Sequence, residues 1–323
     1  MRQISKFRNI LLTAGSVVAL AACGGSNGGS STPPPSTPTP PTSNDRLDQI
    51  QASEDFNSLS SVVLVKVEGI TETIDSASQT ESAEAVVGLD ADVNTAADFT
   101  ITITNQGAGN DVNFDHTFDA ADKTVGTRYT QYVDGNQAFV LLRPGVDITI
   151  PFHPSGETIN LSYVTYGQWA KTDGTVAANG FEKANGFVTF GIRTDSVPTT
   201  GEASYEGIAE GVLYRPTATA GSPDQLSLLG RVEISANFGT NTVVSEFRDF
   251  QATGVGGGAW VEFDSTGTLS NGAFSGAASN FSAGGYSGTV SGAFYGPNAQ
   301  EVGGVWSISG PGEEAAGAFA GEQ

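Results

Sequence analysis

The sequence predicts a mostly β protein whose C-terminal part is a soluble eight-stranded antiparallel β-barrel. Glycine accounts for 42 of the 323 residues and charged residues for only 15%, whereas average domains hold about 7% glycine and about 25% charged residues. Apolar and polar residues alternate along much of the second half, as in strands with one buried and one solvated face. Clusters of turn-forming residues separate these alternating runs.

The N-terminus has the composition of a lipoprotein signal peptide, residues 1–22. Basic residues in the first eight positions precede an apolar run at 10–22. That run is too short to cross a membrane, since a spanning helix needs about 20 apolar residues. The run ends in Leu20-Ala21-Ala22 before Cys23, the only cysteine of the chain. This arrangement resembles the lipobox of bacterial lipoproteins, so we predict that Cys23 is lipidated and begins the mature protein.

Residues 23–46 predict a tether between the lipid anchor and the folded part. Glycine and serine come first, and six of the 14 prolines follow at 33–41, a composition that buries too little apolar surface to fold. Gly24, and not an aspartate, follows Cys23. By resemblance to Gram-negative sorting rules, we predict an outer-membrane, lipid-anchored protein at the cell surface of a Gram-negative bacterium, with the membrane as a partner through its anchor.

Charge and rare residues exclude several classes of function. The 14 Lys and Arg stand against 35 Asp and Glu, a net charge of −21, so we expect no nucleic-acid partner, because phosphates need clustered cations. The single cysteine leaves no internal disulfide and no multi-cysteine zinc site. His116 and His153 are the only histidines. Neither lies in a motif that combines a nucleophile, a base and an orienting group, so we predict no enzyme activity and no cofactor.

The first folded domain, residues 47–195, is predicted to be β-rich, with a short helix at 47–59 as its one weak helical segment. A turn at 133–136 separates two strand-like runs and predicts a hairpin. The runs that predict strands are 61–67, 99–104, 129–133, 138–142, 148–152, 158–166 and 187–193.

The second domain, residues 196–323, alternates more regularly. Val302, Trp306 and Ile308 share one parity, which predicts that they face the interior of the barrel. Glycines on the same parity leave room for neighbouring aromatic rings. Each strand is expected to bury one face, although Ile208 and Val212 are apolar on the other parity. Eight antiparallel strands can close a barrel that side chains fill.

One motif resembles a known family. The run F-Y-G-P-N-A-Q-E-V-G-G at 294–304 and the run G-A-F-A-G at 317–321 are similar to the C-terminal signature of transferrin-binding protein B-like surface lipoproteins. The resemblance implies a single lobe, in which a handle domain precedes an eight-stranded barrel. It also implies a protein that binds a host or environmental iron carrier, or haem, for a partner transporter, here a TonB-dependent receptor. A structural or adhesive envelope lipoprotein of the same fold, without an iron role, is the alternative.

Because the barrel interior is filled, we expect a ligand to contact loops of the handle. The candidate loops are 107–114 and 133–137, which are polar and flanked by aromatic residues. Ordinary solvated turns are the alternative interpretation. His116 and His153 have side chains that can ligate a metal or haem, but a lone histidine is usually structural or exposed, and we predict no metal site. The candidate ligand-binding residues are Asn110, Asp111, Phe114, Tyr132, Asp134 and Asn136.

Overall fold

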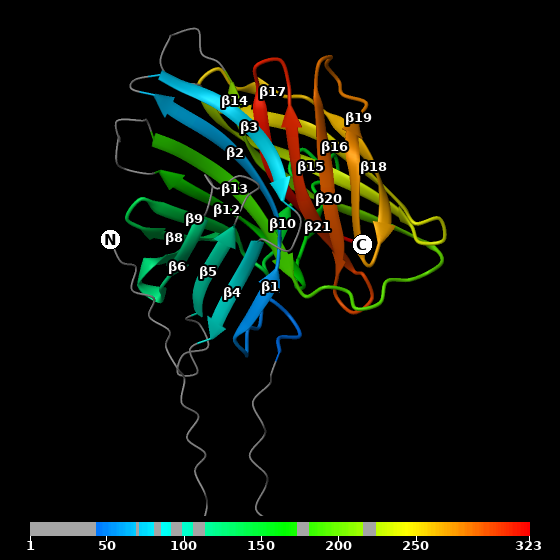
Figure 1. Ribbon diagram of the computed structural model, residues 1–323. Helices are drawn as coiled ribbons and strands as arrows, with labels where there is room; N and C mark the ends of the chain where they lie inside the picture. The colour runs from blue at the N-terminus through cyan, green and yellow to red at the C-terminus, as the bar shows by residue number, and fades with distance from the viewer. Residues whose placement is uncertain are drawn as a thin grey trace, which may run out of the picture. The chain divides into compact units, whose positions relative to one another are not determined.

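The computed structural model describes residues 43–68, 71–80, 85–91, 99–105, 114–172, 181–215 and 224–323 (Figure 1). The predicted signal peptide, Cys23, most of the tether, Asn110 and Asp111 lie outside these ranges. Over the described part of the chain, no helix has the length and apolar character needed to cross a membrane. A single turn of 3-10 helix at Ala120–Asp122 is the one helical element there.

The first half, which we call the handle, consists of three antiparallel sheets. The largest has the strand order β3-β2-β13-β12-β9-β8-β7, the second β1-β4-β5-β6, and the smallest β10-β11. The strands are β1 (Glu54–Asn57), β2 (Leu59–Glu68), β3 (Thr71–Thr80), β4 (Ala85–Ala91), β5 (Phe99–Asn105), β6 (Phe114–Phe118), β7 (Lys123–Val125), β8 (Tyr129–Asp134), β9 (Gln137–Leu142), β10 (Ile148–Thr149), β11 (Thr158–Ile159), β12 (Val164–Thr172) and β13 (Phe181–Gly191).

Three local predictions for the handle are wrong. The run 158–166 is not one strand, because it divides into β11 and the start of β12 with no strand at 160–163. The segment 47–59 is not helical: it forms turns and then β1, in which Phe56 is buried between more exposed neighbours. The run 148–152 is only partly a strand, because Pro151 has no N–H to donate to a ladder. The hairpin at 133–136 is confirmed. Asp134 pairs with Gln137, and Gly135 has the positive φ of 57° that such a tight turn requires.

The second half closes into the predicted barrel of eight antiparallel strands, with β17 as a short addition. Closure comes from the pairing of β15 with β16, which joins the two ends of the sheet. The strands are β14 (Glu202–Arg215), β15 (Asp224–Asn237), β16 (Thr242–Thr253), β17 (Gly258–Ala259), β18 (Phe263–Ser270), β19 (Ala273–Ser279), β20 (Ser287–Tyr295), β21 (Glu301–Ser309) and β22 (Glu314–Glu322).

Aromatic rings lie over glycines inside the barrel, as the sequence predicted. Trp306 is fully buried. Gly317 pairs with it on the next strand, and Gly211 pairs with Gly317 on the strand beyond. A Cβ atom on Gly317 or Gly211 would come within 2.3 or 2.5 Å of the indole. The glycines therefore provide the space that the indole fills.

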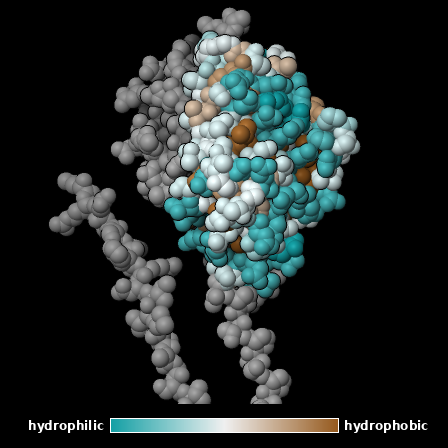
Figure 2. Space-filling model, turned by 90° about the vertical axis from the view of Figure 1, so that its right-hand side faces the viewer, coloured by the Kyte–Doolittle hydropathy of each residue, from teal (hydrophilic) through white to brown (hydrophobic). Residues whose placement is uncertain are grey.

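The expectation that each barrel strand buries only one face is wrong for β14, β21, β22 and the second half of β20. Their outer faces pack against the handle, in a core that combines Ile208 and Val212 with Val63 and Phe187. This explains why those two positions break the alternation. On β18 and β19 burial still alternates with exposure, and the surface seen from that side is largely hydrophilic (Figure 2). Only the strands next to the handle are apolar on both faces.

Candidate functional site

The F-Y-G-P run lies where the handle and the barrel meet, and its two aromatic residues face opposite ways. Phe294 belongs to the barrel core, with its ring 5.4 Å from that of Phe238. Tyr295, the next residue, belongs to the core shared with the handle. Gly296 follows with φ of 81° and turns the chain, and its carbonyl accepts a hydrogen bond from the Thr194 hydroxyl at 2.7 Å. The run thus fastens the barrel to the end of β13.

Glu301, from the same run, binds the backbone of the handle. It is buried, and its carboxylate accepts hydrogen bonds from the N–H groups of Ser162, Tyr163 and Val164 at 2.7–2.8 Å. Burial raises the pKa of Glu301 to about 6, although the three N–H bonds act in the opposite direction. The Ser162 carbonyl in turn accepts the N–H of Leu47 at 2.7 Å. One carboxylate therefore orders the start of β12 and connects it to the barrel.

A second set of polar contacts joins the two halves at Glu210 on β14. The guanidinium of Arg128 lies 2.9 Å from its carboxylate, and the hydroxyl of Tyr129 donates to the same oxygen. Burial raises the pKa of Tyr129, and the adjacent carboxylate adds to this. Both handle residues remain protonated at neutral pH and act as donors. These contacts satisfy a carboxylate that is otherwise mostly removed from solvent.

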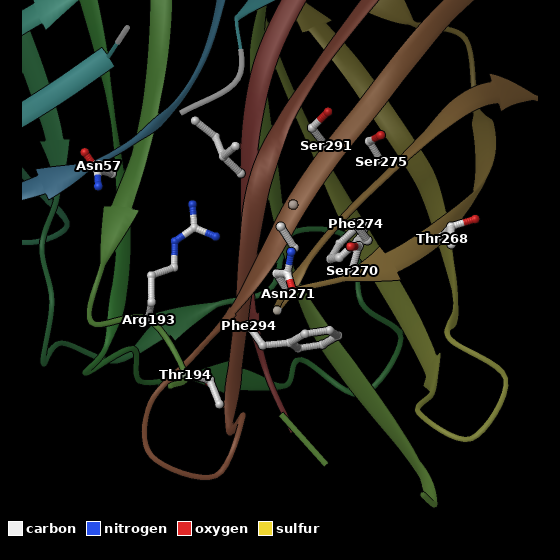
Figure 3. Close-up of a pocket in the computed structure, with 14 residues that line it drawn as sticks. Asn57, Arg193, Thr194, Thr268, Ser270, Asn271, Phe274, Ser275, Ser291 and Phe294 are labelled. Carbon is white, nitrogen blue, oxygen red and sulfur yellow. The ribbon is translucent and has the colours of Figure 1, made fainter. Parts of the chain in front are cut away.

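A cavity of about 480 Å³ opens beside the F-Y-G-P run, between the two halves (Figure 3). Handle residues at the end of β1, at the start of β2 and just after β13 form one side. Residues of β18, β19 and β20 and of the turn between β18 and β19 form the other. Arg193 extends into it, with its guanidinium 4.9 Å from the centroid of the Tyr295 ring. The lining residues are Asn57, Leu59, Arg193, Thr194, Thr268, Ser270, Asn271, Gly272, Ala273, Phe274, Ser275, Ser291, Gly292 and Phe294.

The structure separates the predicted ligand-binding residues. Asp134 and Asn136 are exposed at the β8–β9 hairpin, and the Asp134 carboxylate lies 3.2 Å from Nε2 of His116 on β6. Tyr132 is fully buried and packs against Phe118, with ring centroids 5.9 Å apart. Its ring therefore offers no surface to a partner, because Thr130 and Tyr132 are the two positions of β8 that face the core. Phe114 begins β6.

One side-chain cluster in the described part of the chain has metal-binding chemistry. His153 lies between Glu157 and Glu206, and one ligand atom from each can be chosen so that all three lie within 4.8 Å of one another. The Nε2 atom of His153 is 3.1 Å from the Glu206 carboxylate, and its Nδ1 atom is 2.8 Å from the Ser155 hydroxyl. Imidazole and carboxylate are ligands that zinc accepts. The absence of a metal stays a prediction.

Sequence reasoning missed Arg193 and the role of Glu301. Arg193 lies at the end of the run 187–193, which predicts a strand and gives no indication of a functional role. Glu301 was read as part of a structural motif, without a partner. One signal was available for Arg193, since cations are scarce in this acidic chain. No signal in the sequence places Glu301 beside Ser162, Tyr163 and Val164, because these residues lie far from it in the chain.

Comparison with known proteins identifies the barrel. Residues 197–323 match the family described as the C-lobe and N-lobe beta barrels of Tf-binding protein B. The predicted resemblance is confirmed, and the chain has a transferrin-binding protein B-like fold. No curated protein matches the chain.

Solved structures of lobes from the same family also match. Intact Ap-TbpB, with N and C lobes, is 12% identical, with 84% of this chain and 77% of that chain covered and a TM-score of 0.41. A variant of transferrin-binding protein B from Actinobacillus pleuropneumoniae H49 is 15% identical, with coverage of 81% and 98% and a TM-score of 0.37. The N-lobe domain of lactoferrin-binding protein B from Moraxella bovis is 14% identical, with coverage of 82% and 98% and a TM-score of 0.36.

Proposed function

We propose that this chain, whose residues 197–323 match the barrels of transferrin-binding protein B, is a surface-exposed outer-membrane lipoprotein that binds an iron-carrier protein or haem for a partner transporter. The family match over the barrel is the observation that carries this proposal. The family consists of binding proteins, and the lipobox and tether predicted upstream suit a protein held at a membrane and facing outward. A TonB-dependent receptor is the proposed transporter.

The handle is the proposed contact region. Asp134 and Asn136 project at a tight hairpin whose strands belong to the seven-stranded sheet. Binding residues are often carried on loops that a rigid scaffold positions. Val133, beside them, is also 48% exposed, which adds an apolar contact to the two polar side chains. A structural or adhesive envelope protein of the same fold remains the second candidate, because the barrel match applies equally to it.

Capture experiments test the proposed contact region. The full chain is immobilised and exposed to serum, and separately titrated with haem while the Soret band is followed. We expect recovery of one iron-carrier protein or a saturable Soret shift, and at least a tenfold loss of affinity in the double variant Asp134→Ala/Asn136→Ala. Thr240→Ala, in an exposed turn of the barrel, is the control and should bind normally. Neither carrier nor haem binding to the wild type would favour the adhesive alternative.

The anchor is tested in cells. Labelling with a clickable palmitate should mark the wild type and leave Cys23→Ala unlabelled, because the thiol is the only one in the chain. Label on the Cys23→Ala variant would contradict the anchor. Protease accessibility of the labelled protein on intact cells then reports which side of the outer membrane it faces.

A further inference from the structure

The cavity beside Arg193 has the position and size of a small-molecule site. Its volume of about 480 Å³ lies within the range of about 300–1,000 Å³ that is usual for ligand pockets, which often form between domains. Both halves of the molecule contribute to it, through Asn57 and Arg193 from the handle and Thr268 and Ser275 from the barrel. None of the lining residues belongs to the β8–β9 hairpin, so the cavity is separate from the contact region proposed above.

Arg193 differs from every other arginine that the structure describes. Within those residues its guanidinium makes no hydrogen bond or ion pair, and only the Tyr295 ring faces it. Arg143 donates to backbone carbonyls. The five remaining arginines each lie within 4.0 Å of a carboxylate: Arg46, Arg128, Arg215, Arg231 and Arg248. In a chain with 35 acidic residues, a cation left without a carboxylate and aimed into a cavity is available for an anion from outside.

The rest of the lining is rich in neutral hydrogen-bonding groups. No acidic residue and no second cation stands among the lining residues. Hydroxyl and amide groups line the barrel side and the rim. Most of them belong to exposed residues whose side chains make no hydrogen bond within the described ranges: Asn57, Thr268, Ser270, Asn271 and Ser275. Figure 3 shows Arg193 reaching into the space between Asn57 and Asn271. Such groups both donate and accept hydrogen bonds.

We propose that this cavity binds a small hydroxylated carboxylic acid of the sugar-acid class. The carboxylate pairs with the guanidinium of Arg193, whose planar fork suits two parallel hydrogen bonds and which the Tyr295 ring holds in place. The hydroxyl groups of the ligand exchange hydrogen bonds with the serine, threonine and asparagine side chains. Apolar atoms of Phe274 and Leu59 contact the carbon skeleton.

Three probes separate the contributions of acid and hydroxyl. The full chain is titrated with D-glucuronate, with D-glucose, which lacks the carboxylate, and with propionate, which lacks the hydroxyl groups. Calorimetry or ligand-observed NMR measures the affinity. We expect saturable binding of glucuronate, and binding of the other two weaker by at least about tenfold, as expected for loss of a charge-assisted hydrogen bond. Absence of glucuronate binding, or equal affinity for propionate, overturns the proposal.

Matched variants locate the site. Arg193→Gln should weaken glucuronate binding at least tenfold, whereas Arg143→Gln, which removes a half-buried arginine elsewhere in the handle, should leave it unchanged. Ser275→Leu fills the cavity from an exposed position and should also block binding, which tests the site should Arg193→Gln fail to fold. Unchanged affinity in both cavity variants places the ligand elsewhere and overturns the assignment. Serum capture by Asp134 and Asn136 is measured separately, so each proposal can fail alone.

Discussion

The barrel and the handle are both antiparallel and β-rich, yet they complete their cores differently. Each of the eight main barrel strands pairs on both sides, and its inward side chains form one core. The described handle sheets stay open, and their apolar side chains divide between a core of their own and the core shared with the barrel. The barrel therefore closes its interior by itself, whereas the handle needs the outer face of β14, β20, β21 and β22 to complete its second core.

The difference shows where the two halves depend on each other. The inner face of the barrel needs no help from the handle, but its outer face carries Ile208, Val212 and Val305, which are buried only by the handle. An isolated barrel would expose this apolar area, and contiguous exposed apolar patches promote association. The junction is thus part of the stability of both halves.

The largest effect is expected from replacing one fully buried tryptophan in each half of the molecule. Trp306→Ala in the barrel and Trp169→Ala in the handle each remove a fully buried ring and should each lower the free energy of unfolding by about 3–5 kcal/mol. Guanidinium denaturation measures both, with Val255→Ala, at an 87% exposed position, as the neutral control. If the shared core couples the halves, each variant unfolds in one transition. Two separate transitions would show that the handle and the barrel unfold independently, and that the shared core does not couple them.

A smaller effect is expected at the contact between Glu301 and the handle. Glu301→Ala leaves three backbone N–H groups without their acceptor and should lower the free energy of unfolding by about 3 kcal/mol. Glu301→Gln keeps one oxygen and should lose less. The control is Glu202→Gln, at an exposed carboxylate that accepts from Asn237. Equal stability of Glu301→Ala and wild type would show that the contact does not hold the halves together.

The smallest expected effect is a pH dependence at the same residue. The pKa of Glu301 rises from 4.5 to about 6 on folding, so the folded protein holds the proton more tightly than the unfolded chain. This contribution to stability is complete below pH 4.5 and is lost as the pH rises through 6, by about 2 kcal/mol. The difference in the free energy of unfolding between wild type and Glu301→Gln, measured across pH 4.5–7, isolates this contribution. The contributions of the other carboxylates are the same in both proteins and cancel in the difference. If the free energies of unfolding of the two proteins changed in parallel with pH, the raised pKa of Glu301 would be contradicted.

The sequence predicted the barrel well because its signal is local. Period-two alternation and glycines opposite aromatic rings are properties of neighbouring strands, and they placed Trp306 inside correctly. The handle was harder, since Pro151 interrupts one predicted strand and β12 and β13 are buried on both faces along most of their described length.

The candidate sites were less predictable because they depend on contacts between distant parts of the chain. The hairpin at 133–136 follows from its turn residues. The burial of Tyr132, however, depends on Phe118, which belongs to the four-stranded sheet β1-β4-β5-β6 and not to the sheet of Tyr132. The Arg193 cavity needs β1, β13 and three barrel strands together. No pattern within one segment contains that information, whereas the fold supplies it.

If the proposed lipid anchor holds the chain by its N-terminus, the hydrogen bond between Leu47 and Ser162 has a mechanical consequence. A pulling force from the N-terminal side would meet the hydrogen bonds of Asn44 to Ala52 and Glu54 first. It would then pass through the bonds of Arg46 and Leu47 to Ser162 to the start of β12. There the carboxylate of Glu301 accepts hydrogen bonds from three successive N–H groups. Part of the force would pass on to the β21–β22 hairpin of the barrel. The contact between the handle and the barrel would therefore carry part of such a force.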